Sequence, residues 1–100
     1  MNYRVQFTGQ ARSELKQVGL FIARDNPVRA ETFVDELVNH YREMLSLFPE
    51  TGRKVEGTEV RQLSYKGYTA FYEIDGEREL ISILHLVNLE KPLDARGIEF

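Results

Sequence analysis

The sequence contains no cysteine and no tryptophan. Without cysteine, the protein has no disulfide framework, no thiolate nucleophile and no thiolate metal site. No apolar run approaches the roughly 18 residues of a membrane span, and the N-terminal segment lacks the pattern of a signal peptide. We therefore expect a cytoplasmic protein with no membrane partner.

Positive charge is also scarce, since 13 basic residues stand against 16 acidic ones and the net charge is -3. Proteins that hold RNA or DNA through its phosphates usually present a basic face. We therefore expect no direct sequence-specific binding of nucleic acid by the chain alone. The length of 100 residues, 42% of them hydrophobic, predicts one domain over residues 1–100 with a modest core.

The N-terminal half predicts one short strand and two helices. Residues 3–7 alternate between apolar and polar side chains, which is typical of a strand with one apolar face. Thr8 is a predicted N-cap, and apolar residues recur at helical spacing from about 9 to 24. Asn26 is the predicted N-cap of a second helix, which has Pro27 at its first position and stops near Pro49. The short connection predicts an antiparallel helical hairpin.

The C-terminal half predicts a three-stranded meander after a polar loop at 50–58. Turn signals at 66–67 and 75–76 separate strands at about 59–65, 68–74 and 78–87. The last ten residues show no clear pattern and are interpreted as coil after the last strand. The order β-α-α-β-β-β predicts an α+β fold. In it, the antiparallel helical hairpin packs on one face of a small, mainly antiparallel sheet that the first strand joins.

The turn at 66–67 assigns side chains to the two faces of this sheet. The face predicted to pack against the helices carries Arg61, Leu63, Tyr65, Tyr68, Ala70 and Tyr72. The face predicted to be more exposed, where a site could form, carries Val60, Gln62, Ser64, Thr69, Phe71 and Glu73.

Three side chains are candidates for chemistry, and each also has a structural interpretation. Arg61 and Tyr72 could hold a phosphate, but an arginine stem lying along the sheet beside a tyrosine is the favoured interpretation. His85 could be a general base because histidine titrates near neutral pH. It has no arginine or tyrosine after it, so a histidine that caps the core or bonds a backbone carbonyl is favoured. His40 lies among charged residues and is expected to face solvent.

No pattern points to a metal or a cofactor. The acidic residues are scattered over helix faces and a turn, whereas a metal site needs clustered ligands. The sequence has no phosphate-binding loop, dinucleotide fingerprint or nucleophile elbow. We therefore expect neither a metal site nor a cofactor.

Several short segments in a fixed order carry a resemblance that covers roughly residues 5 to 88. They are F-T-x-x-A-x-x-E-L at 7–15, NP-x-x-A at 26–30, L-x-x-x-P-E-x-G-R at 45–53, V-R-Q-L at 60–63, GYTAFYEI at 67–74 and ISILHLVN at 81–88. Together they resemble the RelE/ParE superfamily of toxins from bacterial type II toxin–antitoxin systems. This resemblance implies the same hairpin-on-sheet fold.

The superfamily divides by mechanism. RelE-like members are ribosome-dependent mRNA endonucleases. They have Lys or Arg on the exposed sheet face, an Arg just after the Gly-Tyr of the third strand, and an Arg or a Tyr after the last strand. The corresponding positions here are Val60, Gln62, Thr69 and residues 86–88, so the basic set is missing, and Glu73 adds negative charge. ParE-like members lack that set, are described as poisons of DNA gyrase, and often end the last strand in I-L-H before a polar, non-basic tail.

The resemblance therefore implies a ParE-like toxin that is not an enzyme and whose target is DNA gyrase. Two alternatives remain: a RelE-like ribonuclease that uses Arg61 and His85, or an inactive member that only binds antitoxin. The superfamily also implies a cognate antitoxin that docks a helix on the hairpin. The candidate contacts are Leu20, Phe21, Val34 and Val38, which can equally be core residues. Gyrase contacts follow no fixed motif, so no target-binding residue is predicted.

Overall fold

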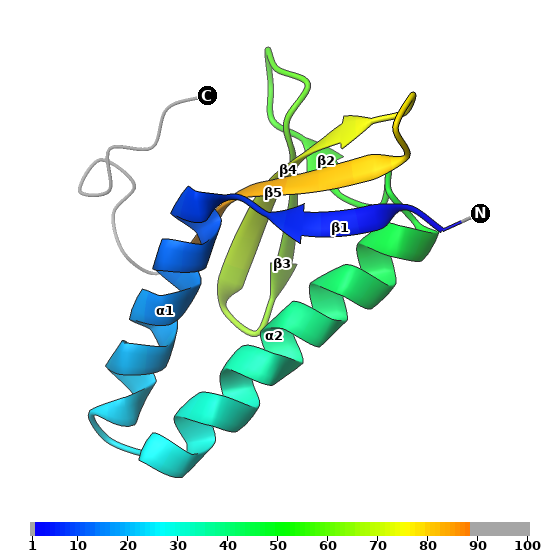
Figure 1. Cartoon of the computed structure of the whole chain (residues 1–100). Helices are drawn as coiled ribbons and strands as arrows, with labels where there is room; N and C mark the ends of the chain where they lie inside the picture. Colours follow the sequence, from blue (N-terminus) through cyan, green and yellow to red (C-terminus); the bar gives the residue numbers. More distant parts are fainter. Residues whose placement is uncertain (1, 89–100) are drawn as a thin grey trace.

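A computed structural model of the chain describes residues 2–88, and Figure 1 shows the arrangement of its elements. In chain order these are β1 (Arg4–Phe7), α1 (Gly9–Ala23), α2 (Pro27–Leu47), β2 (Arg53–Lys54), β3 (Arg61–Tyr65), β4 (Tyr68–Asp75) and β5 (Leu80–Asn88). This is the predicted α+β order with one additional strand, since the two-residue β2 lies within the region predicted as loop. The prediction for the last ten residues lies outside the described residues.

The five described strands form one sheet in the order β1-β5-β4-β3-β2. β1 pairs parallel to β5, while the other neighbours are antiparallel. The first strand thus joins the sheet, as predicted, and does so beside the last strand. Both helices lie on one side of the sheet, and the connection between α1 and α2 is at the end of the hairpin that points away from the strands (Figure 1).

Local polar contacts account for the helix starts. The Thr8 hydroxyl accepts the N–H of Ala11, and the Asn26 side chain accepts the N–H of Arg29, so each residue caps a helix as predicted. Pro27 begins α2, where its missing N–H is not needed.

The turn before β5 is longer than predicted, so β5 begins at Leu80 and not at residue 78. The Asp75 carboxylate accepts the N–H groups of Glu77 and Arg78 and continues the turn. Glu79 then adopts a positive φ of 51° immediately before the strand. A side chain that bonds nearby backbone in this way extends a turn at the expense of the strand.

The main core lies between the helices and the sheet. Its fully buried side chains include Leu37, Tyr41 and Leu45 from α2 and Ala70, Tyr72, Ile81 and Ile83 from the sheet. The hydroxyl of Tyr41 donates to the carbonyl of Tyr68 at 2.9 Å, so this buried polar group has a partner. The helix-facing side of β3 and β4 was therefore correctly predicted.

The opposite face of the sheet was predicted to be more exposed, and for three residues this is wrong. Val60, Thr69 and Phe71 are buried, with Phe71 only 5% exposed. Val60 and Phe71 form a second, smaller cluster with Val87, against which two partly buried residues, Val55 and Leu84, pack. The prediction treated β3 and β4 alone, whereas β5 and the loop before β3 add apolar side chains to this face. Neither helix of the described part of the chain is both long and apolar enough to cross a membrane.

Candidate functional site

The guanidinium of Arg61 is bound to backbone and holds a loop. One nitrogen, Nη1, donates to the carbonyl of Gly52 at 2.7 Å and to that of Glu50 at 3.2 Å. The hydroxyl of Tyr72, the cross-strand neighbour of Arg61, donates to the carbonyl of Pro49 at 2.8 Å and accepts the N–H of Gly52 at 2.9 Å. These contacts match a structural role, with the pair fastening the loop after α2 to the sheet.

His85 lies beside a carboxylate from α1. Its Nδ1 is 3.3 Å from Oε2 of Glu14, whose Oε1 accepts the N–H of Leu86 at 3.0 Å. A register shift next to the Phe71–His85 pair makes Ile83, not Leu84, the partner of Tyr72. The histidine thus sits at an irregular point of β5 where α1 contacts the strand, and its neighbour is acidic rather than a phosphate-binding cation.

The structure does not bring the two ribonuclease candidates together. Arg61 is on β3 and His85 is on β5, and β4 lies between these strands. Two strand spacings separate them by roughly 10 Å, and Arg61 turns toward the loop at 49–52. A catalytic pair would need both groups within hydrogen-bond reach of one substrate phosphate.

The positions expected to carry cations in a RelE-like nuclease do not do so. Val60 is buried, and Thr69 is buried with its hydroxyl 2.7 Å from that of Ser64. Gln62 is neutral and partly buried, and Glu73 adds a carboxylate to the exposed end of the same face. Such a surface has no group at these positions to neutralise charge that develops on a phosphate.

A groove of about 610 Å³ lies between the two helices. Its lining residues are Lys16, Gly19, Leu20, Ala23, Pro27, Ala30, Glu31, Thr32, Val34 and Asp35. Gly19 allows the helices to approach closely, because a Cβ there would lie 3.3 Å from Cγ2 of Val34. The floor is largely apolar, with Lys16 contributed by α1 and two carboxylates by α2.

The structure separates the four residues predicted to contact an antitoxin. Leu20 and Val34 line this groove, and Leu20 is 53% exposed. Phe21 is half exposed on α1 but is not part of the lining. Val38 packs against the main core. Val38 is thus a core residue, whereas antitoxin contact by Leu20, Phe21 and Val34 stays a prediction.

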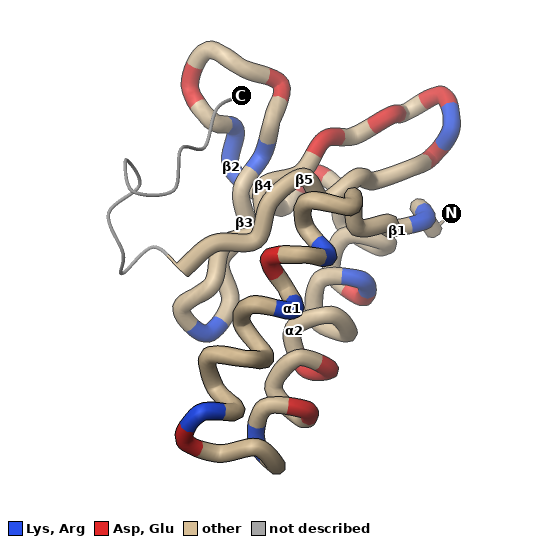
Figure 2. The backbone as a smooth tube through the Cα atoms, turned by 60° about the vertical axis from the view of Figure 1, so that its left-hand side comes forward, with Lys and Arg blue, Asp and Glu red and all other residues tan. Residues whose placement is uncertain are grey.

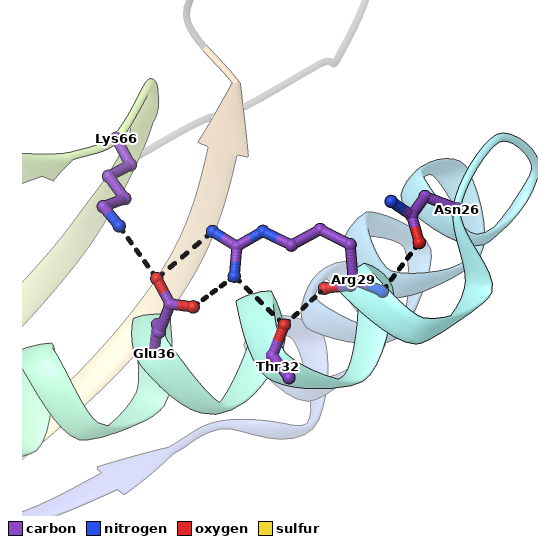
Figure 3. A network of polar contacts seen from close by, with 5 residues as sticks. All are labelled: Asn26, Arg29, Thr32, Glu36 and Lys66. Atoms are coloured by element: carbon purple, nitrogen blue, oxygen red, sulfur yellow. Dashed lines mark hydrogen bonds and ion pairs between the residues drawn. The ribbon is translucent and has the colours of Figure 1, made fainter.

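Sequence reasoning missed a polar network that joins α2 to the turn between β3 and β4 (Figure 3). The carboxylate of Glu36 binds the guanidinium of Arg29 and, at 2.8 Å, the ammonium of Lys66. The hydrogen bond from Arg29, helped by that from Lys66, lowers the pKa of Glu36 to about 2. The spacing of seven residues between Arg29 and Glu36 indicates a shared helix face, but nothing local predicts the remote lysine.

His40 does not simply face solvent, and that expectation is corrected. Its ring stacks on Tyr65 with centroids 3.7 Å apart and planes 8° from parallel. Partial burial in this contact lowers the pKa of His40. Among residues 2–88, His40, His85 and the acidic residues nowhere gather into a group of three or more that could hold a metal ion.

Solved structures with this fold include toxin–antitoxin systems. A chain of the chromosomal ParDE system from P. aeruginosa has a TM-score of 0.75 and 21% identity, covering 86% of this chain and 95% of its own. A chain of the toxin–antitoxin complex RelBE2 from Mycobacterium tuberculosis has a TM-score of 0.68 and 24% identity, covering 88% and 92%. A chain of the intact E. coli RelBE complex has a TM-score of 0.65 and 18% identity, covering 89% and 99%. These likenesses establish the fold.

The sequence itself establishes the family. The family model described as ParE toxin of type II toxin–antitoxin system, parDE, matches residues 5–88. The chain therefore belongs to the ParE toxin family, within the superfamily that its motifs resemble. No curated protein matches the sequence.

Proposed function

We propose that this protein is a toxin that arrests growth by binding and poisoning DNA gyrase, and that a cognate antitoxin neutralises it. The observation that carries the proposal is the state of Arg61 and His85. The first is bound to backbone carbonyls of its own loop, and the second lies beside Glu14. Arg61 is engaged in holding a loop, and the neighbour of His85 is a carboxylate and not a phosphate-binding cation, which supports a toxin that acts by binding rather than by phosphate chemistry.

The proposal makes the protein a binding partner and not an enzyme. RNA cleavage needs a base, an acid and cations placed around one phosphate. Uncharged residues occupy the positions on the sheet face where a RelE-like toxin has cations, namely Val60, Gln62 and Thr69. Glu73 on the same face would repel a phosphate. The family match over residues 5–88 supports the same assignment. Gyrase is a cytoplasmic target, so we place the toxin in the cytoplasm.

The groove between α1 and α2 is the docking site that we propose for the antitoxin. The similar chains come from structures described as a ParDE system and as RelBE toxin–antitoxin complexes, and we extend an antitoxin partner from them to this chain. An amphipathic helix can lay its apolar face into such a groove. Leu20 and Val34 would contact its apolar side, and Lys16 on α1 and Asp35 on α2 would contact charges at its rims.

Growth and DNA damage distinguish the possible targets. The chain is expressed alone from an inducible promoter in a bacterial host that carries a DNA-damage reporter. Growth arrest with the reporter on is the expected result and leads to supercoiling assays with purified gyrase. Arrest with the reporter off, together with cleavage of mRNA on translating ribosomes, would overturn the gyrase proposal. His85→Ala and Arg61→Gln would then test which groups cleave.

A matched pair of variants tests the groove. Leu20→Asp places a charge on its apolar floor, and Val28→Asp places one on an exposed residue of α2 outside the lining. Both chains should arrest growth, but an antitoxin that rescues the parent chain should fail to rescue Leu20→Asp and should still rescue Val28→Asp. Equal rescue of the two variants would place the antitoxin elsewhere.

A further inference from the structure

An apolar pocket of about 530 Å³ lies at the C-terminal end of α2, far from the hairpin connection. It is lined by Tyr3, Phe48, Pro49, Glu50, Thr51 and Ile74. Phe48, one of these lining residues, is 59% exposed. A large aromatic side chain left half in water, beside space that could take another apolar group, is typical of a surface that binds a partner.

A polar pocket of about 460 Å³ continues this apolar one. It is lined by Glu50, Lys54, Glu59, Arg61, Glu73 and Ile74. Glu50 and Ile74 belong to both linings, so the two pockets adjoin, and we call them together the 48–74 groove. One end of the 48–74 groove is apolar and the other is charged.

The charged end has an excess of negative charge, since its lining carries the carboxylates of Glu50, Glu59 and Glu73 against the cations of Lys54 and Arg61. Lys54 forms an ion pair with Glu59 at 3.1 Å, and Arg61 donates to two backbone carbonyls. Neither Glu50 nor Glu73 forms an ion pair within the described chain. The two loops at this end of the sheet, between β2 and β3 and between β4 and β5, also carry more acidic than basic residues (Figure 2). The groove therefore favours a positively charged occupant.

A strand edge also opens at this groove. β4 extends to Asp75, but its pairing with β3 ends at Tyr72. Residues 73–75 have β5 on one side and, among the described strands, none on the other. An extended peptide can add to such an edge through backbone hydrogen bonds while its alternate side chains enter neighbouring pockets.

We propose that the 48–74 groove binds an extended segment of a partner protein that carries an aliphatic or aromatic residue next to lysine or arginine. The apolar residue enters the pocket beside Phe48, and the basic residue contacts Glu50 and Glu73. Nucleic acid does not fit, because phosphates would face these carboxylates. The inference is independent of the proposed gyrase target and of the antitoxin groove, which lies between the helices.

The test uses the full chain and a fluorescein-labelled peptide of sequence Arg-Leu-Phe-Arg-Lys, with binding followed by fluorescence anisotropy. We expect saturable binding that weakens as salt is added, and none of a peptide in which glutamate replaces each basic residue. In the NMR spectrum of the labelled protein, the peptide should shift the amide signals of Thr51 and Ile74. An absence of binding, or equal binding of the acidic peptide, would overturn the proposal.

Two pairs of exposed variants separate the groove from general surface effects. Phe48→Ser should weaken peptide binding about tenfold, while Leu47→Ser should leave it unchanged, since Leu47 is 56% exposed but outside the lining. Glu73→Lys should weaken binding and reduce its salt dependence, while Glu77→Lys, in the neighbouring loop, should have a much smaller effect. Equal losses within either pair would contradict the proposal. A competition experiment with spermidine gives a further check. If spermidine displaces the peptide from Phe48→Ser as well as it does from the parent chain, the groove is a simple polyamine site and the proposal is contradicted.

Discussion

The carboxylate of Glu14 on α1 accepts the backbone N–H of Leu86 on β5, at 3.0 Å. β1 accompanies β5 only as far as the pair of Phe7 and Ile83. Thr8 bonds to the carbonyls of Ile83 and Leu84, and Glu14 then supplies an acceptor of the kind that a longer β1 would provide. A side chain of α1 thus closes the edge of β5 where β1 ends.

Removing this acceptor should lower the free energy of unfolding. We expect Glu14→Ala to cost about 1–2 kcal/mol, because the N–H of Leu86 is partly buried and would lose its partner. Glu14→Gln keeps an acceptor oxygen and should cost less. Urea denaturation of both variants and the parent chain measures the difference. Equal stability of all three would mean that water replaces the carboxylate at no cost.

A methyl group at Gly52 should disrupt the loop that Arg61 and Tyr72 hold. A Cβ there would lie 2.4 Å from the Tyr72 hydroxyl oxygen and 2.8 Å from the carbonyl oxygen of Gln62. Gly52→Ala should therefore lower the free energy of unfolding by about 1–3 kcal/mol, the usual cost of overpacking. Gly9→Ala is the control, because its added Cβ would meet no atom within 4 Å apart from those of its chain neighbours and of its own helix backbone. The expectation fails if thermal denaturation places both variants at the same midpoint.

Acid should weaken the fold through Glu36. Its carboxylate is held by Arg29 and Lys66, which lower its pKa from 4.5 to about 2. Because the folded pKa is depressed, the stabilisation is complete above about pH 4.5 and is lost as the pH falls toward 2. Midpoints of thermal unfolding measured across this range should therefore drop further for the parent chain than for Glu36→Gln. Parallel pH profiles would show that this solvent-exposed network contributes nothing measurable.

The stacked ring of His40 should make the stability of the fold depend on pH in a second range, closer to neutrality. Its folded pKa lies below 6.5, because burial against Tyr65 disfavours the charged ring. Below pH 6.5 the unfolded chain therefore binds a proton more readily, and stability falls until the folded pKa is reached. His40→Phe keeps a flat ring against Tyr65 and should remove this component. The midpoint of thermal unfolding of both chains is measured between pH 7 and 5. If the two midpoints fall in parallel, groups other than His40 cause the loss of stability.

The elements could be predicted from the sequence because their signals are local. Apolar spacing, the caps at Thr8 and Asn26 and the turn at 66–67 each involve residues a few positions apart. The resulting register, with Arg61 opposite Tyr72, followed from the turn alone and is confirmed. The two-residue β2 lacks such a signal, since only its pairing with β3 makes it a strand.

The candidate site was harder to predict because its contacts join distant parts of the chain. Glu14 and His85, or Glu36 and Lys66, are neighbours only in the folded protein. The burial of Phe71 and the stacking of His40 likewise depend on elements elsewhere in the sequence. The residue types at 60, 62 and 69 could be judged without a structure, because their meaning came from a family resemblance and not from contacts.

The parallel pairing of β1 with β5 has a consequence for synthesis on the ribosome. β1 is made first, yet within the described sheet its strand neighbour is residues 80–83, close to the end of the described chain. β5, which lies between β1 and β4 in the sheet, is thus synthesised after every other described strand. A chain that stops early lacks the strand on which β1, α1 and β4 all pack. The native β1–β5 pair, a contact of high sequence separation, therefore cannot form until residues 80–83 have been synthesised.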